Sequence, residues 1–217
     1  MNSIMVFLEK YIMYFLRGTY ITIEISLLAV IFGAIIGFLL TLLKTSKVKV
    51  LNIIGISYTE FIRGTPVLVQ LYMGYFGLGI LGFRSNLIFI SVAILSLNSA
   101  AYISEIIRAG IQSIDKGQIE AAMSLGMNKL LTLKEIIVPQ ALRNIFPALG
   151  NEFIVIIKES AVVSIIGLHD LMYNTGTVKS VAYKPFLPYV IASLFYFVLT
   201  FTLSKFLGKI ERGMKVY

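Results

Sequence analysis

The stretch Asp115–Gln140, DKGQIEAAMSLGMNKLLTLKEIIVPQ, is charged and amphipathic, yet it lies in the middle of a very apolar chain. Of the 217 residues, 58% are hydrophobic and only 14% are charged, whereas about 25% are charged in a typical soluble domain. Apolar runs as long as a bilayer is thick lie on both sides of this stretch. The contrast predicts an integral membrane protein that holds one sizeable polar segment outside the bilayer.

Five apolar segments are each long enough to cross the roughly 30 Å hydrocarbon core of a bilayer as an α-helix. These segments are residues 18–43, 53–81, 87–107, 148–168 and 186–207. Their hydrophobic residues run continuously and do not alternate with polar ones, which favours helices over the strands of a membrane β-barrel. The sequence therefore predicts an all-α integral membrane protein, a single transmembrane domain over residues 1–217 with five membrane-spanning helices.

The region before the first of these segments is shorter and mixed in polarity. We expect residues 1–17 to lie in the membrane interface as an amphipathic lead-in, because Glu9 and Lys10 interrupt the apolar run. Within the first segment, Gly33 and Gly37 form a GxxxG pattern that permits close approach of a second helix, although many membrane helices carry such a pair by chance.

The lysine and arginine residues are distributed unequally between the two sides of this predicted topology. One side holds 12 of the 19 and the other holds 5, while Arg63 and Lys158 fall inside spans. The positive-inside rule then places the N-terminus outside and the C-terminus in the cytoplasm, and it explains the net charge of +8 better than nucleic-acid binding does. The opening stretch lies in the longest cytoplasmic loop, about residues 108–147.

Composition excludes several classes of site. The chain has no cysteine and a single histidine, His169, so disulfides and cysteine zinc sites are excluded and a multi-histidine metal site is not expected. We predict no catalytic residue, no metal site, no cofactor in this chain and no cleavable signal peptide. The phosphate-loop pattern GxxxxGK[ST] is also absent, because Phe83 and Arg84 follow the glycines of residues 77–82. Energy from ATP would have to come from another chain.

Polar residues interrupt the second apolar segment at TEFIRGTPVLVQ, residues 59–70. Pro66 has no N–H and disfavours helix at Thr65, so we expect the helix to loosen there. Irregular backbone at membrane depth is tolerated against protein or a water-filled cavity, and with Arg63 beside it this break is a candidate anchor for a carboxylate. Alternatively, Arg63 pairs with Glu60 on the same helical face and only ties helices together.

Two further segments carry polar faces that would meet in a shared pathway. Asn98, Tyr102 and Glu105 are spaced i, i+4, i+7 in the third segment. Glu152 and Glu159 share one face of the fourth segment. Carboxylates outnumber cations inside the spans, which favours a cationic solute. The alternative is a set of internal pairs, such as a lysine with a nearby glutamate, that only hold the bundle together.

We assign roles to these residues from their chemistry and their place in the spans. The candidate substrate-binding residues are Arg63, Thr65, Asn98, Tyr102, Glu152, Lys158 and Glu159. The arginine and the threonine would bind a carboxylate, and the asparagine and the tyrosine would supply hydrogen bonds. The two glutamates would attract an ammonium group or a basic side chain.

Local signals predict a short helix at the start of the cytoplasmic loop. Asp115 and Gln118 form a variant of the capping box, and Gly126 is a natural C-terminal stop. A helix of about two turns is too short to be stable alone in water. It therefore needs a surface to pack against.

A second helix is predicted to follow. Thr132 and Glu135 repeat the capping signature, and Pro139 and Pro147 are expected to interrupt the path back into the membrane. The two helices with their glycine hinge would form a compact protrusion, unless the segment is an ordinary loop between spans.

The stretch EAAMSLGMNKLLTLKEIIVPQAL resembles the EAA loop of the permease subunits of binding-protein-dependent ABC importers. The residues that match the family pattern are Glu120, Ala121, Ala122, Gly126, Ile137 and Pro139. Val138 stands where leucine is commoner, which is a mild departure. The runs EFIRGTPVLVQLY, NSAAYISEIIRAGIQSIDKGQ and LGNEFIVIIKESAVVSIIGLHDL are similar to the subfamily that carries polar amino acids, and the resemblance extends from about Gly18 to the C-terminus.

This resemblance implies the fold of a type I ABC importer transmembrane domain, with five spans and the N-terminus outside. The residues Glu120, Ala121, Ala122 and Gly126 would belong to a coupling helix that docks on a separate ATPase. The implied partners are two ATPase subunits that hold ATP and magnesium, a second permease subunit (an identical copy in preference to a different one), and an extracellular or periplasmic solute-binding protein. That protein would dock on outer loops, including residues 168–185, of a prokaryotic cytoplasmic membrane protein.

The function expected from residues and resemblance together is ATP-driven import of a polar L-amino acid by alternating access. The surplus of carboxylates favours arginine, lysine or histidine, and the alternatives are glutamine, glutamate and cystine. A secondary transporter or channel would also use intramembrane glutamates, but it gives no reason for the EAA loop. An intramembrane enzyme would need a nucleophile–base pair or a metal cluster, for which one histidine and no cysteine leave little material.

Overall fold

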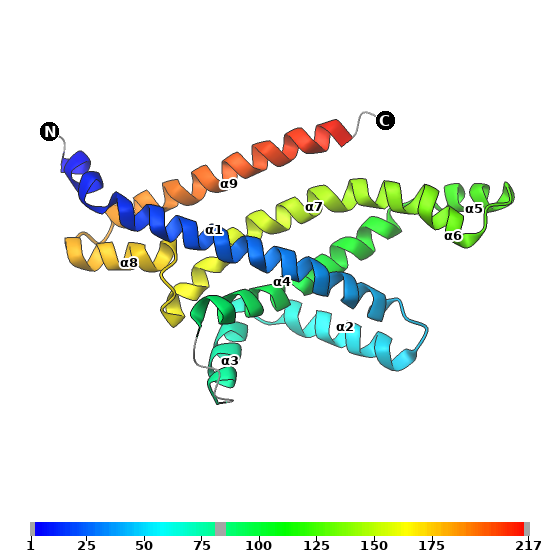
Figure 1. Cartoon of the computed structure of the whole chain (residues 1–217), viewed down its shortest axis with the longest axis horizontal. Coiled ribbons are helices and arrows are strands. Elements are labelled where there is room, and N and C mark those ends of the chain that lie inside the picture. Colours follow the sequence, from blue (N-terminus) through cyan, green and yellow to red (C-terminus); the bar gives the residue numbers. More distant parts are fainter. Residues whose placement is uncertain (1–2, 81–85, 215–217) are drawn as a thin grey trace.

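The computed structural model describes residues 3–80 and 86–214, and all of its regular elements in these ranges are helices (Figure 1). They are α1 (Ser3–Lys44), α2 (Lys49–Gly64), α3 (Val67–Ile80), α4 (Leu87–Gln112), α5 (Lys116–Ser124), α6 (Lys129–Thr132), the π-helix η1 (Leu133–Ile137), α7 (Val138–Glu159), the 3₁₀-helix η2 (Ser160–Ile166), α8 (Leu171–Ala182) and α9 (Leu187–Met214). The predicted all-α class is confirmed. The end of the second expected span, residue 81, and Phe83 and Arg84 lie outside the described residues.

Three of the described helices are long and apolar enough to cross a membrane, namely α1 from Met5 onward, α4 and α9. The second expected span is divided into α2 and α3. The fourth expected span is α-helical to Glu159 and continues as η2. The count of five crossings therefore stays a prediction, because neither of these two segments is one continuous α-helix.

The lead-in expected before the first span does not exist as a separate element. Helix α1 runs unbroken for 42 residues, about 60 Å, because no proline or capping residue stops it at Arg17 or Gly18. Gly18 serves a different purpose, since a Cβ there would lie 2.7 Å from Leu171 Cα and 2.8 Å from Asp170 O. The glycine lets the backbones of α1 and α8 touch.

The GxxxG pattern of α1 lies against α4, as the pattern predicted. A Cβ on Gly37 would lie 2.9 Å from Ala100 O, and one on Gly33 would lie 3.1 Å from Ser99 Cβ. Farther along the same contact, Thr41 Oγ1 donates a hydrogen bond to Ser104 O over 3.3 Å. Helix α4 is thus fixed closely to α1 along the stretch that carries its polar residues.

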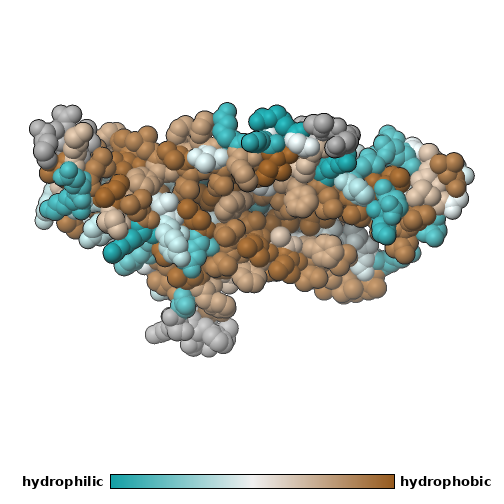
Figure 2. Space-filling model, turned by 45° about the horizontal axis from the view of Figure 1, so that its top comes forward, coloured by the Kyte–Doolittle hydropathy of each residue, from teal (hydrophilic) through white to brown (hydrophobic). Residues whose placement is uncertain are grey.

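Apolar side chains form three buried clusters along the molecule. One joins α1, α8 and α9 through Phe15, Leu171 and Ile191. The second joins α1, α4, α7 and η2, and the third joins α3, α4 and η2. Large hydrophobic side chains nevertheless remain exposed, including Phe38 on α1 and Phe197 on α9. Figure 2 shows broad apolar surface, with polar groups at both ends and in patches along the upper and lower edges, as expected of a chain in contact with lipid or another subunit.

The two predicted sides of the membrane are separated along the long axis of the molecule. The end of α1, the start of α2, the end of α4 and the α5–α6 region lie toward one end (Figure 1). The start of α1, helix α8 and the start of α9 lie toward the other. The basic residues that the charge count placed together, such as Lys44 and Arg108, are therefore also close in space.

Candidate substrate pathway and coupling segment

The helix break expected at Thr65 and Pro66 is present. Helix α2 ends at Gly64, Thr65 has extended backbone angles (φ −120°, ψ 144°), and α3 begins at Val67. The carbonyls at the end of α2 have no partner within that helix. The Thr65 hydroxyl donates to Phe61 O over 2.9 Å, and the side-chain amide of Gln70 donates to Ile62 O over 2.8 Å.

Gln70 was not singled out from the sequence, although it closes the break. Its Nε2 also lies 3.1 Å from Thr65 O and 2.9 Å from Thr65 Oγ1. On the far side, Gln70 Oε1 accepts a hydrogen bond of 2.9 Å from Asn98 Nδ2 in α4. The signal that could have found it is a polar residue four positions after a proline within an apolar run.

A second hydrogen bond continues from α4 to α7. Ser99 Oγ donates to Glu152 Oε1 over 2.9 Å, and both residues are buried. We call Thr65, Gln70, Asn98, Ser99 and Glu152 the polar layer. It brings together three of the predicted binding residues, from the break after α2, from α4 and from α7, which supports the expected meeting of these segments.

The remaining predicted residues of α2 and α4 belong to a separate group of charges. Glu105 forms an ion pair with Lys44, a second with Arg108 over 2.8 Å, and a third with Arg63 over 3.8 Å. The Arg63 guanidinium also lies 5.6 Å from the ring centre of Tyr102. In the described part of the chain Arg63 thus pairs with Glu105, and not with Glu60 as one interpretation held.

This charge cluster, defined as Lys44, Arg63, Glu105 and Arg108, borders a pocket of 370 Å³ between α1, α2 and α4. Thr59 and Glu60 line the same pocket. Asn98 belongs to the polar layer, whereas Glu105 belongs to the charge cluster, so the polar face predicted on α4 serves two sites.

The end of α7 presents the other predicted residues. Glu159 is the last residue of α7, partly buried and seven positions beyond the buried Glu152 on the same face. Lys158 is exposed and forms no salt bridge with any glutamate in residues 3–80 and 86–214. The internal lysine–glutamate pair that the sequence left open is therefore not formed.

The short helix predicted from Asp115 to Gly126 is α5. Its Asp115 cap and its Gly126 stop form as expected, but Gln118 does not complete the capping box, because its Oε1 accepts a hydrogen bond from Gln140 Nε2. Asp115 accepts a hydrogen bond of 2.7 Å from Gly117 N–H. At the other end the N–H of Met127 donates to Ala122 O and the N–H of Gly126 donates to Met123 O. These are the two hydrogen bonds of a Schellman cap. Gly126 has φ +86°, which an L-residue rarely adopts.

The surface around α5 is apolar as well as charged. Ala122 is buried, while Glu120 and Ala121 are exposed. Leu125 is 85% exposed and Leu130 is 75% exposed. Two exposed leucines therefore lie beside a helix of only nine residues and add apolar surface to its charged face.

The second predicted cap and the proline interruptions are wrong. Helix α6 begins at Lys129, because Asn128 Oδ1 accepts from Leu131 N–H over 2.9 Å; Thr132 is already helical and donates to Asn128 O. The chain then continues through η1 into α7, with Pro139 in its first turn and Pro147 inside it. Pro139 has no N–H to donate. The π-helical turn directly before it changes the hydrogen-bond pattern, so that the helix continues without that bond.

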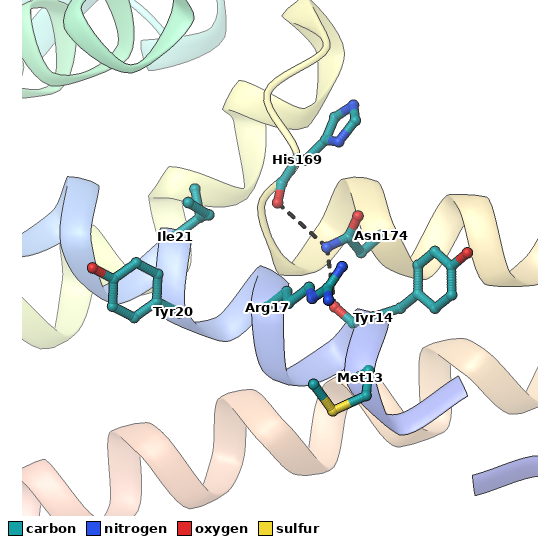
Figure 3. Close-up of a pocket in the computed structure, with 7 residues that line it drawn as sticks. All are labelled: Met13, Tyr14, Arg17, Tyr20, Ile21, His169 and Asn174. Carbon is teal, nitrogen blue, oxygen red and sulfur yellow. Dashed lines mark hydrogen bonds between the residues drawn. The ribbon is translucent and has the colours of Figure 1, made fainter. Parts of the chain in front are cut away.

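A pocket of 540 Å³ lies toward the opposite end of the molecule, between the first half of α1 and the N-terminal end of α8 with the residues that precede it (Figure 3). It is lined by Met13, Tyr14, Arg17, Tyr20, Ile21, His169 and Asn174. The Asn174 side-chain amide donates to Tyr14 O over 3.0 Å and to His169 O over 3.4 Å, as the dashed lines in Figure 3 show. These bonds fix the segment before α8 to α1.

Beside this pocket, Asp170 caps α8 from a fully buried position outside the expected spans. Its Oδ1 accepts from Tyr173 N–H over 2.9 Å, while its Oδ2 is buried without a hydrogen-bond partner among the described residues. Tyr196 of α9 lies close enough to interact with it electrostatically. Burial raises the pKa of Asp170 to about 7, although the N–H of Tyr173 acts in the opposite direction.

We expect the protein to lose stability as the pH rises from about 4 to about 7. In this window the folded state holds a proton on Asp170 that the unfolded state, with an ordinary pKa of 3.8, has released, so protonation favours folding. Asp170→Asn is neutral and keeps an acceptor for Tyr173 N–H, so its melting temperature should lack this component. Melting curves of both proteins at several pH values in one detergent give the comparison. A difference between them that does not change with pH would contradict the assignment.

The fold and the site define a helical membrane protein with a broken helix, a buried polar layer and a short, largely exposed helix, α5. Residues 14–216 match the family described as binding-protein-dependent transport system inner membrane component. The chain belongs to this family, the permease subunits of ABC importers.

Relatives and solved structures agree with this membership. The chain is 43% identical over 206 residues, 94% of each chain, to the putative glutamine transport system permease protein GlnP of Rickettsia felis. It is 45% identical over 204 residues, 93% of each chain, to the arginine transport system permease protein ArtQ of Bacillus subtilis. A crystal structure of an amino acid ABC transporter with histidines superposes with a TM-score of 0.92 at 46% identity, covering 98% of this chain and 99% of that one.

The class of transporter follows from these likenesses. This chain is a multi-pass inner-membrane permease of an amino-acid ABC importer, and ATP is hydrolysed by a separate subunit. A methionine transporter structure, MetNI, with a TM-score of 0.78 at 18% identity, over 95% of this chain and 99% of that one, shares the fold. The family further implies ATPase and binding-protein partners.

Proposed function

We propose that the protein imports a basic L-amino acid through a pathway between the α2–α3 break, α4 and α7. The observation that carries this proposal is the acidic face of α7. In the described ranges neither of its glutamates forms a salt bridge: Glu152 is buried and accepts a hydrogen bond from Ser99, and Glu159 lies two turns farther along the same face. Carboxylates in such a setting attract a cationic group. The relatives named for arginine and glutamine, and the solved transporter with histidines, support an amino-acid substrate.

The two ends of the amino acid would meet different parts of this pathway. Arg63, held loosely by Glu105 and half exposed, would bind the α-carboxylate together with the backbone at Thr65. Asn98 and Tyr102 would supply hydrogen bonds. The two glutamates would bind the basic side chain, with Lys158 at the rim to limit the net negative charge.

Helix α5 would be the coupling helix. Its caps fix a helix of nine residues, and the exposed side chains of Leu125 and Leu130 would give an ATPase an apolar surface to bind. Two copies of this chain would pair, each on one ATPase subunit. With the N-terminus outside, a solute-binding protein would dock on residues 168–185, next to the pocket of Figure 3.

Substrate binding to the purified complex tests the site. We expect Glu159→Gln to lower the affinity for arginine about tenfold, because it removes one charge-assisted interaction of about 1.5 kcal/mol. Asn98→Ala should weaken binding of every amino acid that binds, since its role does not depend on the side chain. The measurement is isothermal titration with arginine, lysine, histidine, glutamine and glutamate.

Two outcomes would redirect the proposal. Preference of the wild type for glutamine or glutamate over the basic amino acids would exclude the cationic substrate. Unchanged affinity in both variants would remove these residues from the site. Glu9→Gln, exposed near the start of α1 and away from the polar layer, serves as the control of equal charge change and should bind as the wild type does.

A further inference from the structure

Gln70 holds both the helix break and α4 with the two ends of one side-chain amide. Its Nε2 lies within 3.1 Å of three oxygens, one on Ile62 and two on Thr65. Its Oε1 accepts from Asn98 Nδ2 over 2.9 Å. Only 8% of the residue is exposed. These hydrogen bonds therefore prevent the side-chain amide of Gln70 from flipping by 180°.

The direction of the Gln70 amide is set by the backbone. The carbonyl oxygens of Ile62 and Thr65 can only accept hydrogen bonds. The Thr65 hydroxyl gives its hydrogen to Phe61 O, so it too can only accept from Gln70. A reversed amide would set Gln70 Oε1 against three acceptors, and each would lose its donor. Nε2 must face the break, and Oε1 must face α4.

The direction of the Asn98 amide follows from that of Gln70. Only the NH₂ group of Asn98 can donate to Gln70 Oε1, so Asn98 Oδ1 must point the other way. Asn98 is 2% exposed, and this oxygen has no hydrogen-bond partner within the described ranges. A buried acceptor without a donor costs about 1–3 kcal/mol, which an arriving N–H group would recover.

We propose that Gln70 is a positioning residue that makes Asn98 present an acceptor, and not a donor, to the α-ammonium group of the transported amino acid. This inference rests on the proposed amino-acid site. The Gln70 side-chain amide bonds to Thr65 at one end and to Asn98 at the other, so the helix break lies close to Asn98. The α-carboxylate and the α-ammonium group of an amino acid are also close together, because both are bonded to the same carbon. The solute would then bind with its carboxylate toward Arg63 and its ammonium toward α4. Because Asn98 Oδ1 is closed off in this conformation, the solute reaches it in another state of the transport cycle.

Pairs of ligands with and without the α-ammonium group test this role. Gln70→Met keeps the length of the side chain but removes both ends of the amide. In the complex purified with its ATPase, we expect this variant to bind L-arginine at least about tenfold more weakly, the value of a hydrogen bond to a charged group. Its affinity for des-amino arginine should equal that of the wild type. L-histidine and L-glutamine, with their des-amino analogues, are the parallel probes.

Asn52→Leu is the matched control. The Asn52 amide also donates to a carbonyl at a helix end, that of Lys44, but it lies at the α1–α2 turn away from the polar layer. This variant should bind every probe as the wild type does. Asn98→Leu should show the same selective loss as Gln70→Met, and the double variant should lose no more than Asn98→Leu alone, because Gln70 acts through Asn98.

The outcomes separate the inference from the function on which it rests. Equal losses for arginine and des-amino arginine, or additive losses in the double variant, would make Gln70 a purely structural residue and overturn the inference. Unchanged affinity in Gln70→Met would do the same. A wild-type complex that binds none of the three amino acids would overturn the proposed function itself. If Gln70→Met does not assemble, Asn98→Leu alone decides between selective and equal loss.

Discussion

Gly126→Val is expected to abolish ATP-coupled uptake while the transmembrane helices stay folded. Gly126 has φ +86°, and a β-branched residue there costs about 1–3 kcal/mol. Helix α5 has only nine residues and little stability of its own, so this cost unwinds the Schellman cap and frees the EAA surface. If α5 is the coupling helix, a shift of this size leaves it docked in a small minority of molecules. Uptake into proteoliposomes and ATPase activity are measured together.

A charge change on the same helix gives an independent version of this experiment. Glu120→Arg keeps the helix, since Glu120 is exposed, but reverses the charge on the surface proposed to face the ATPase. We expect both variants to retain wild-type melting temperatures and to lose at least about tenfold in uptake per ATP hydrolysed, a change of about 1.4 kcal/mol. Lys134→Ala, 79% exposed on η1, is the control and should transport normally. Normal coupled uptake by Gly126→Val and Glu120→Arg would refute the docking role of α5.

Gly37→Val should destabilise the transmembrane bundle and weaken substrate binding at the same time. A Cβ at this position would lie 2.9 Å from Ala100 O, which is backbone and cannot move aside alone. Overpacking of this kind costs about 1–3 kcal/mol. Because α4 also carries Asn98 and Ser99, pushing it away from α1 should disturb the polar layer. The expected result is a melting temperature several degrees lower, with reduced affinity for the transported amino acid.

Gly208→Val is the control for the change of residue type. Gly208 is also helical, but the nearest atom to its added Cβ would be Arg212 Nη1 at 3.8 Å, an ordinary contact. This variant should melt close to the wild type and bind substrate normally. If the two variants melt at the same temperature, the close approach of α1 and α4 does not contribute to stability, and the packing argument is wrong.

The polar layer and the charge cluster explain how a permease can hold ionisable groups between apolar helices. In the polar layer one hydrogen bond joins α3 to α4 and another joins α4 to α7, so a shift of α3 or α7 is transmitted to α4. In the charge cluster one carboxylate, Glu105, binds cations from α1, α2 and α4 itself.

Local features were predicted correctly because their causes lie within a few residues of sequence. The break at Pro66 follows from a missing N–H, and the bounds of α5 follow from the Asp115 cap and the positive φ of Gly126. The wrong predictions also came from local signals, but in these cases the surrounding residues determined a different structure. Thr132 looks like a cap until Asn128, four residues earlier, has already capped the helix. Pro147 would end an isolated helix, yet α7 continues through it.

Pairing between helices could not be predicted in this way. Arg63 has Glu60 within one turn, but its partner is Glu105, 42 positions later, because α2 and α4 approach each other at that level. Gln70 and Asn98 are 28 positions apart. Lys158 has glutamates on both sides in sequence and pairs with neither in the described residues, because it points to the surface of α7.

The sequence by itself determined that this protein is a helical membrane permease with a broken second apolar segment and a short capped helix in its polar stretch. Hydrophobic run length, proline chemistry and caps act over a few residues, and the EAA stretch is contiguous. Only the tertiary structure decided which polar groups face one another and which acceptor remains free. The directions of the Gln70 and Asn98 amides depend on backbone carbonyls and on a second helix, and hydrogen-bond geometry of that kind exists only after the helices have packed.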